Sequence, residues 1–414
     1  MKVLQVYNDY RTHCGGEGAV VQMIHALLEK RGHQARLFTK TSKGLDASLL
    51  GKVRAFANGI YSRSSYRDMA QILHAERPDL VHVHNLYPLI SPSVLVASHR
   101  ARLPVVMTSH NYMLTCPVVN HLHKGQVCER CLGGREYWCV VKNCRENLAE
   151  SMAYALRGFI ARKLNWFQRH VTLHMVLSEF AKARLVKEGF EESRIAVLPN
   201  MVNLGPEQND RTLGSYVAFS GRMKEEKGVD VLLAAAPRLP DVPFRLAGDG
   251  PILDELRKNA PANVLFVGRL EPNQMAAFYA GARFLIVPSK WYEGCPLVVS
   301  EGMSQSLPVI ASRIGGLPEF VDDGVTGLLF EPGNSVELAE RIRLLWGNPD
   351  LCLQMGTAGR RKASQEYNEN LYYERLMSIY REALKLARGN CHASEPSVPR
   401  SVALSACAPI ARKG

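Results

Sequence analysis

The sequence predicts an α/β protein made of two Rossmann-like domains that face each other across a cleft. In both halves of the 414-residue chain, short apolar segments of strand type alternate with segments of helical periodicity. Residues 204–214, which are polar and rich in turn formers, separate the two series. Glycine-containing loops follow several strands, at the ends where open parallel sheets bind their ligands.

The composition is that of a globular protein with substantial cores. Hydrophobic residues make up 46% of the chain, which suits two or three domains. No segment reaches the roughly 20 consecutive apolar residues of a membrane-spanning helix. Residues 3–7 read as a first strand and not as a signal peptide, so we expect a cytoplasmic protein.

The excess positive charge lies entirely in the first half. Residues 1–205 contain 27 Lys and Arg against 15 Asp and Glu, a net charge of +12, whereas residues 206–414 contain 24 of each kind. This asymmetry indicates either an anionic partner, such as a phospholipid surface or a lipid-linked phosphate, or a solvated basic face. No helix-turn-helix, zinc-finger or RNA-binding signature is present, so we expect no nucleic-acid partner.

The first half opens with a strand, a glycine loop and a helix. Gly15 and Gly16 lie between the strand at residues 3–8 and the helix at residues 19–31. The glycine spacing is not the dinucleotide fingerprint, so the loop either lets the backbone approach another ligand or simply forms a tight turn. The further strands expected in this half are 35–39, 80–84, 104–108, 171–178 and 195–198.

Three histidines follow or occupy these strands. His110 comes just after the strand at residues 104–108, at a ligand-binding sheet edge. His82 and His84 alternate along one strand and are either a metal pair or, as we favour, structural histidines with satisfied hydrogen bonds.

An insertion at residues 116–144 contains five cysteines. Without a secretion signal a disulfide framework is not expected. Cys128 and Cys131 have the two-residue spacing of a zinc knuckle, and Cys116 with Cys144, or Cys139 in its place, completes a tetrahedral set. The spacing therefore predicts a structural zinc site on Cys116, Cys128, Cys131 and Cys144, and the alternative is a group of reduced cysteines that pack.

A long helix is expected at residues 148–170. It carries four basic residues beside five large apolar ones. Such a helix either lies on an anionic membrane or packs internally, and Lys163 falls within its apolar arc.

The second half repeats the strand and helix alternation. Its expected strands are 216–220, 244–247, 264–267, 284–287 and 309–311. Arg222 and Lys227 flank a glycine loop before a helix that starts near residue 229, an arrangement that suits a diphosphate.

Two carboxylates follow the strand at residues 284–287. Glu293 precedes a helix opened by Pro296, and Glu301 lies eight residues after Glu293, inside that helix. The helix start offers free N–H donors, so the corner can hold a phosphorylated ligand while the carboxylates bind hydroxyl groups. The alternative is an acidic helix start that favours the helix dipole.

Taken in this order, the motifs resemble the family 4 glycosyltransferases, which are retaining, nucleotide-sugar-dependent enzymes of the GT-B fold. The resemblance covers about residues 1–385, and the cysteine-rich insertion occurs in a subgroup of the family. It rests on five features: Gly15-Gly16, His110, the loop at residues 221–228, the pair Glu293 and Glu301, and residues 315–319.

The resemblance implies a role for each of these residues. Arg222 and Lys227 would bind the donor diphosphate without a catalytic metal, and Glu301 would accept hydrogen bonds from the ribose. Glu293 would hold the sugar hydroxyls. The backbone N–H groups that would help it belong to Gly294, Cys295 and Leu297. His110 would lie near the transferred sugar, and Gly15 and Gly16 would approach the donor phosphates.

The expected domains are an acceptor-side domain at residues 1–205, a donor-binding domain at 206–370, a crossover helix at 371–388 and a disordered tail at 389–414. The expected reaction moves a hexose from a UDP- or GDP-linked donor to a saccharide. We expect a lipid-linked acceptor in surface or exopolysaccharide biosynthesis, on the inner face of the cytoplasmic membrane. The alternatives are a soluble small acceptor, or a nucleotide-sugar-binding protein without turnover.

Overall fold

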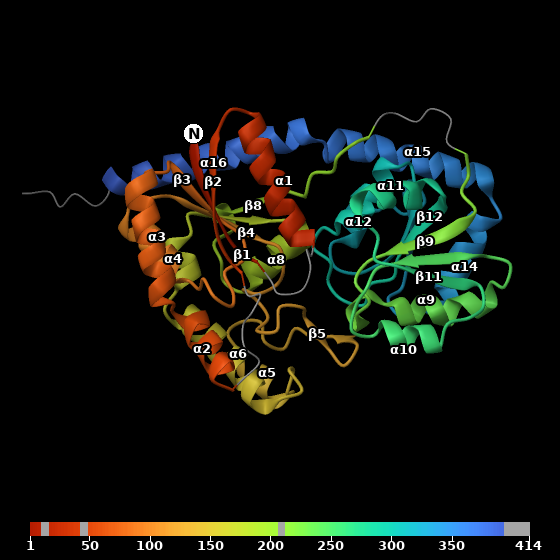
Figure 1. Cartoon of the computed structure of the whole chain (residues 1–414), viewed down its shortest axis with the longest axis horizontal. Coiled ribbons are helices and arrows are strands. Elements are labelled where there is room, and N and C mark those ends of the chain that lie inside the picture. Colours follow the sequence, from red (N-terminus) through yellow and green to blue (C-terminus); the bar gives the residue numbers. More distant parts are fainter. Residues whose placement is uncertain (10–15, 42–48, 206–211, 393–414) are drawn as a thin grey trace, which may run out of the picture.

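Two six-stranded parallel sheets form the centres of the two halves (Figure 1). The computed structural model describes residues 1–9, 16–41, 49–205 and 212–392. The first sheet has the strand order β2-β1-β3-β4-β7-β8 and the second β11-β10-β9-β12-β13-β14. The second order reads 3-2-1-4-5-6 along its half, which is the Rossmann order. The predicted fold, two Rossmann-like domains of GT-B type, is confirmed.

The strands of the first sheet are β1 (Lys2–Asp9), β2 (Gln34–Thr41), β3 (Leu80–Val83), β4 (Val105–Ser109), β7 (Leu173–Val176) and β8 (Ile195–Val197). Those of the second sheet are β9 (Tyr216–Ser220), β10 (Phe244–Ala247), β11 (Val264–Gly268), β12 (Ala282–Val287), β13 (Val309–Ser312) and β14 (Gly327–Phe330). A hairpin, β5 (Leu122–His123) and β6 (Gln126–Val127), belongs to the insertion. β14 and the hairpin were not predicted.

The helices of the first half are α1 (Gly16–Lys30), α2 (Leu49–Ile60), α3 (Arg63–Glu76), α4 (Ser93–Arg100), α5 (Tyr137–Val141), α6 (Leu148–Lys163), α7 (Trp166–His170), α8 (Glu179–Lys187) and the short η1 (Glu192–Arg194). Those of the second half are η2 (Glu225–Lys227), α9 (Val229–Ala235), η3 (Ala236–Arg238), α10 (Leu253–Lys258), α11 (Pro272–Ala280), α12 (Leu297–Ser304), α13 (Leu317–Phe320), α14 (Ser335–Trp346) and α15 (Pro349–Glu366). The last helix, α16, spans Glu369–His392.

The helix predicted at residues 148–170 is broken. α6 ends at Lys163 and α7 begins at Trp166. Between them Asn165 has a φ of 50°, in the left-handed region that asparagine adopts more readily than most residues.

The final helix returns from the second half to the first, where Figure 1 shows it above the first sheet. Tyr372, Leu376 and Tyr380 of α16 are buried in one core with residues of β1 and β3. The hydroxyl of Tyr380 lies 2.7 Å from His82 Nδ1. α16 continues to His392, so residues 389–392, predicted to be disordered, are helical, and residues 393–414 lie outside the description.

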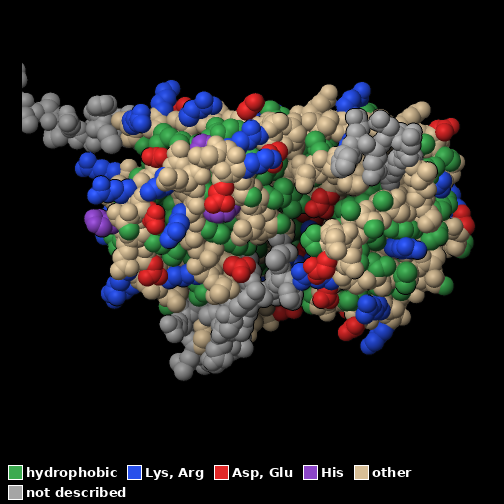
Figure 2. All heavy atoms as spheres, turned by 45° about the horizontal axis from the view of Figure 1, so that its top comes forward, with side chains coloured by type: hydrophobic (Ala, Val, Ile, Leu, Met, Phe, Trp, Pro, Cys, Tyr) green, Lys and Arg blue, Asp and Glu red, His purple; other side chains and the backbone are tan. Residues whose placement is uncertain are grey.

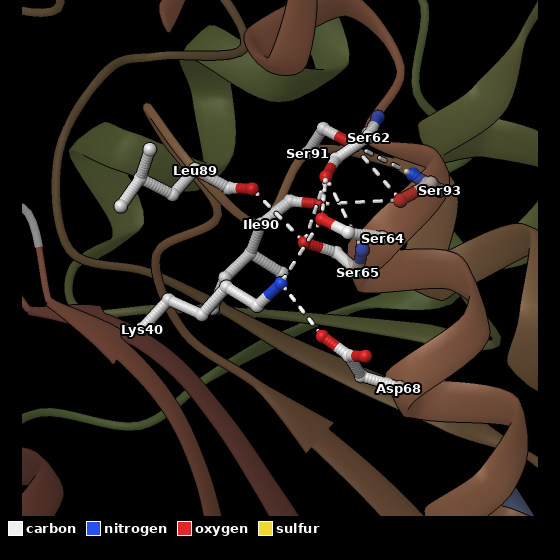
Figure 3. Close-up of polar contacts among 9 residues, drawn as sticks. All are labelled: Lys40, Ser62, Ser64, Ser65, Asp68, Leu89, Ile90, Ser91 and Ser93. Carbon is white, nitrogen blue, oxygen red and sulfur yellow. Dashed lines mark hydrogen bonds and ion pairs between the residues drawn. The ribbon is translucent and has the colours of Figure 1, made fainter.

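A network of serine hydroxyls fixes the chain segment that follows β3 (Figure 3). Ser62 N–H donates to Ser91 Oγ over 2.9 Å, and Ser65 Oγ donates to Leu89 O over 3.0 Å. Leu89 N–H in turn donates to Asn8 Oδ1 over 3.0 Å. These bonds hold the segment against the end of β1, at the edge of the sheet that faces the second half.

The surface drawn in Figure 2 carries Lys and Arg side chains scattered over both lobes, with acidic side chains among them. A hollow separates the two lobes in this view. Among the described residues, no helix is long and apolar enough to cross a membrane.

Candidate active site

A buried carboxylate, Glu293, lies in the loop between β12 and α12, and only 4% of this residue is exposed. Ser289 Oγ donates to its Oε1 over 2.6 Å, and Lys227 Nζ donates to the same oxygen over 2.7 Å. Burial alone would raise the pKa of Glu293, but the Lys227 charge and hydrogen bond outweigh it and the pKa is lowered. The carboxylate is therefore ionised at neutral pH.

Two glycines fix the backbone of Glu293 from the other side. Gly316 N–H donates to Glu293 O over 2.8 Å. Gly315 has a φ of 61°, and a Cβ at this position would lie 2.7 Å from Glu293 N. The motif at residues 315–319 therefore contains glycine because the two loops touch.

The loop that carries Lys227 is pressed against the Glu293 loop. A Cβ at Gly228 would lie 1.8 Å from Pro288 O, and the φ of this glycine is 69°. Arg222, at the start of the same loop, is exposed, and its guanidinium makes no ion pair with the described residues. The structure thus brings Lys227 to Glu293 and leaves Arg222 open to solvent.

The second carboxylate, Glu301, lies one turn into α12. Pro296 is the N-cap of this helix, so α12 begins one residue later than predicted. Tyr279 OH donates to Glu301 Oε2 over 3.0 Å. Burial raises the pKa of Glu301, in contrast to that of Glu293. The pKa values of the two carboxylates thus shift in opposite directions, because Glu293 pairs with a cation, whereas Glu301 pairs with a neutral hydroxyl.

His110 lies at the end of a chain of hydrogen bonds that starts near the surface. His25 Nδ1 is 2.9 Å from Gln5 Oε1, Gln5 Nε2 is 3.5 Å from His84 Nε2, and His84 Nδ1 is 3.0 Å from His110 Nε2. Burial lowers the pKa of His110 to about 4 and holds that of His84 well below its usual value, so both rings are neutral. Because Gln5 donates to His84 Nε2, His84 donates from Nδ1 and His110 keeps its own proton on Nδ1.

His82 does not form a metal pair with His84. Its Nε2 lies 2.7 Å from Thr108 Oγ1 and its Nδ1 2.7 Å from the Tyr380 hydroxyl. Both ring nitrogens are therefore occupied within the core.

The starts of α1 and α12 meet at Gly16. A Cβ at Gly16 would lie 3.4 Å from Leu297 Cδ1, so the first half approaches the donor-side helix here. Gly15 lies outside the described residues. Gly294 lines a small pocket together with His110, and the carbonyl of Cys295 accepts from Asn200 Nδ2 over 3.1 Å.

Glu319, the last residue of the motif at residues 315–319, forms hydrogen bonds with the first half across the cleft. Its carboxylate accepts the backbone N–H groups of Glu179 over 2.8 Å and of Phe180 over 2.7 Å. These are free donors in the first turn of α8, so Glu319 caps a helix of the first half.

The cysteines of the insertion form a small core. Cys131 and Cys139 are buried there beside Ala155, and Cys144 packs against them. Cys139 Sγ lies 3.6 Å from Ser151 O. The five cysteines of the insertion are free.

The zinc prediction for Cys116, Cys128, Cys131 and Cys144 is not supported. No group of three or more His, Cys, Asp or Glu is arranged to hold a metal ion in the part of the chain that the structure describes. Burial and the neighbouring thiols of Cys116, Cys144 and Cys128 raise the pKa of Cys131, whereas a hydrogen bond with Cys139 lowers the pKa of Cys144 to about 7. Cys131 and Cys139 instead pack in the small core of the insertion, beside partly buried apolar residues such as Trp138 and Val140.

Three residues at the site were not predicted: Tyr112, Glu129 and Tyr292. Tyr112 is buried and lines the pocket with His110, and its hydroxyl has no hydrogen-bond partner among the described residues. Tyr292 OH donates to Glu129 Oε1 over 3.0 Å across the cleft. The available signal was position alone, since one tyrosine follows His110 by two residues and the other directly precedes Glu293.

Family models match both halves of the chain. Residues 14–205 match the model described as Glycosyltransferase Family 4, and residues 214–348 match that described as Glycosyl transferases group 1. An uncharacterised glycosyltransferase of Methanocaldococcus jannaschii is 27% identical over 333 residues, which cover 78% of this chain and 80% of that protein. The α-maltose-1-phosphate synthase of Mycolicibacterium smegmatis is 33% identical over 183 residues, which cover 40% of this chain and 47% of the synthase.

Solved structures resemble most of the chain, across both halves. The Anabaena protein HepE in complex with UDP has a TM-score of 0.65 at 18% identity, and the match covers 92% of this chain and 100% of HepE. The sucrose-phosphate synthase of Thermosynechococcus elongatus has a TM-score of 0.67 at 18% identity, with 95% and 100% covered. At this identity the likeness shows a common fold.

Proposed function

Because the chain is a glycosyltransferase of family 4 with the GT-B fold, we propose that it moves a hexose from a nucleotide diphosphate sugar to a saccharide acceptor. The observation that carries the proposal is the pair of Lys227 and Glu293, a cation and a buried carboxylate 2.7 Å apart at the edge of the second sheet. The pair lies between two loops and beside the start of α12, where N–H groups favour phosphate.

Each charged residue has a proposed role. Lys227 and Arg222 bind the diphosphate, and they stabilise the negative charge that develops on the leaving nucleotide. Glu293 accepts hydrogen bonds from hydroxyls of the hexose, and Glu301 accepts them from the ribose. His110, which burial keeps neutral and whose Nε2 faces His84, donates from Nδ1 to the transferred sugar. The new bond forms on the face from which the nucleotide departs, so the anomeric configuration is retained.

The donor carries UDP or GDP. HepE of Anabaena has been crystallised with UDP-glucose, which makes this sugar nucleotide the first probe. A thermal-shift panel of UDP- and GDP-linked hexoses and free nucleotides tests the proposal. A ligand present at 100 times its Kd should add about 2.7 kcal/mol of stability.

The Lys227→Met variant should lose the response to the donor. Lys182→Met is the matched control, because its ammonium pairs with Glu192 at 3.0 Å and has a similar exposure, 23% against 26% for Lys227. Failure of every nucleotide sugar to stabilise the wild-type protein would contradict the donor assignment. A stabilising donor without turnover in the presence of acceptors would favour the alternative of a non-catalytic binding protein.

We propose a lipid-linked acceptor, presented at an anionic membrane surface as in surface or exopolysaccharide biosynthesis. A row of apolar side chains supports this, since seven of the fourteen large hydrophobics exposed on the described surface lie on or beside α5 and α6. They are Tyr137, Val141, Leu148, Met152, Leu156, Phe159 and Leu164, each between 42% and 65% exposed. Lys163 lies within 5.9 Å of the Phe159 ring, so a cation accompanies the row.

Flotation with vesicles of phosphatidylglycerol and phosphatidylcholine tests the membrane contact. Wild-type protein should float, and Leu156→Glu should not. Leu265→Glu is the control, because Leu265 is 56% exposed in the second half. Absence of flotation at low salt would favour the alternative of a soluble acceptor.

A further inference from the structure

The insertion between β4 and α6 reaches the second half of the molecule. Figure 1 shows its hairpin, labelled at β5, between the two lobes. Gly125 forms the hairpin turn, and a Cβ there would lie 3.0 Å from Glu225 Oε1. Glu225 belongs to the loop that carries Arg222 and Lys227. The hairpin tip therefore touches the proposed diphosphate-binding loop.

A second contact joins the insertion to the loop of Glu293. Glu129 Oε1 accepts the hydrogen bond of the Tyr292 hydroxyl over 3.0 Å. Arg184 Nε of α8 forms an ion pair with the same oxygen at 2.6 Å, and Lys187 Nζ lies 3.5 Å from Oε2. Partial burial would raise the pKa of Glu129, but Tyr292, Arg184 and Lys187 together lower it. An ionised carboxylate thus holds the tyrosine.

The ring of Tyr292 is enclosed by residues of the first half. Its centroid lies 4.6 Å from that of Phe180, 5.7 Å from that of His121 and 5.9 Å from that of Tyr112. The guanidinium of Arg184 lies 5.3 Å from the ring centroid. Edge-to-face aromatic contacts and a cation over the ring fix its orientation as well as its position.

Tyr292 and Glu293 are adjacent, and the loop is anchored on both sides. The Tyr292 side chain is held by the first half, while the Glu293 side chain and backbone are held by Lys227, Ser289 and Gly316 of the second half. A displacement of Tyr292 therefore displaces the backbone that carries Glu293.

We propose that the insertion positions two loops of the second half. Glu129 is a positioning residue that orders residues 288–296 through Tyr292, and the hairpin of the insertion supports residues 221–228. Cys131 and Cys139 form the small buried core from which the insertion extends. The catalytic consequence rests on the proposed function, whereas the positioning itself is measurable without any substrate.

Hydrogen exchange of the ligand-free protein tests the positioning. Glu129→Gln and Tyr292→Phe should each speed exchange of amides in 288–296 by about tenfold, because a hydrogen bond to a charged group is lost. The double variant should exchange no faster than either single variant, because both remove the same bond. Exchange in the β-strands and the thermal midpoint should change little.

Glu192→Gln serves as the control, since its ion pair with Lys182 involves α8 but does not cross the cleft. It should leave exchange at 288–296 unchanged. Unchanged exchange in both Glu129→Gln and Tyr292→Phe, or acceleration spread over the whole protein, would overturn the proposal.

Turnover supplies the second measurement once a donor is known, with UDP-glucose as the first probe. Both variants should raise the donor KM or lower kcat, with kcat/KM reduced about tenfold, while Glu192→Gln retains the wild-type values. If the two variants exchange faster at residues 288–296 but keep the wild-type kcat/KM, the catalytic consequence of the proposal is wrong. Inactivity of the wild-type protein would count against the proposed function and leave the exchange result standing.

Discussion

Lys227 and Glu293, 66 positions apart in the chain, meet through a hydrogen bond of 2.7 Å between Nζ and Oε1. Their loops follow β9 and β12, which are neighbours in the second sheet although two strands separate them in sequence. The contact thus forms where the strand order changes direction, the position at which open α/β sheets bind ligands.

Replacing Lys227 by methionine should reduce kcat by about 10²-fold or more, since a preorganised charge is removed from the leaving diphosphate. The variant also leaves the buried Glu293 carboxylate without its cation. Its pKa should rise, and the protein should lose stability at neutral pH. Steady-state kinetics and urea unfolding measure the two effects, with Lys182→Met as the control. Wild-type turnover in Lys227→Met would remove this lysine from the site.

The sequence predicted the members of this pair but not their contact. Hydrophobic periodicity and short motifs reveal local features, such as the strand ends, the glycines and the spacing of Glu293 and Glu301. That Lys227 approaches Glu293 depends on the strand order. The enclosure of the Tyr292 ring by residues of the first half depends in addition on how the two halves pack against each other. No local sequence pattern encodes this packing.

The zinc site expected from the cysteine spacing is not supported, for a related reason. A two-residue knuckle such as Cys128 and Cys131 specifies a metal only when the other thiols converge on the same point. Here Cys131 and Cys139 face a small apolar core. Likewise the break between α6 and α7 depends on the left-handed Asn165, which helical periodicity does not reveal.

The buried histidines should make the protein less stable as the pH falls below 6.5. Burial lowers the pKa of His110 and of His174 to about 4 and that of His82 to about 3. Between these values and 6.5 the unfolded chain binds protons that the folded chain does not, so unfolding is favoured as acid is added. Chemical unfolding at pH 7, 6 and 5 should show the decrease.

The His84→Gln variant separates this effect from that of the carboxylates. Its pH slope should be smaller by up to one proton, or about 1.4 kcal/mol per pH unit. His74→Gln, at an exposed position of α3, should keep the wild-type slope. Equal slopes in wild-type protein and His84→Gln would show that His84 is already protonated in the folded state.

Glu17 should have the opposite dependence. Burial raises its pKa to about 8, and its Oε1 has no hydrogen-bond partner in the described part of the chain. The unfolded chain releases this proton near pH 4.5 and the folded chain only near pH 8, so stability declines as the pH rises through that window. Glu17→Gln should match the wild-type thermal midpoint near pH 4.5 and exceed it at pH 8. A variant less stable than wild type at pH 8 would mean that the ionised carboxylate has a stabilising contact.

Tyr112 offers a test that separates ligand binding from folding. Its hydroxyl is buried beside His110 and none of the described residues is its hydrogen-bond partner, so Tyr112→Phe should leave the thermal midpoint unchanged or raise it. If the hydroxyl binds a sugar hydroxyl, kcat/KM should fall about tenfold. Tyr380→Phe is the matched control, because the Tyr380 hydroxyl is 2.7 Å from His82 Nδ1 and its loss should cost about 1 kcal/mol of stability. A Tyr112→Phe protein that loses stability but keeps full activity would show that the hydroxyl serves the fold and not the substrate.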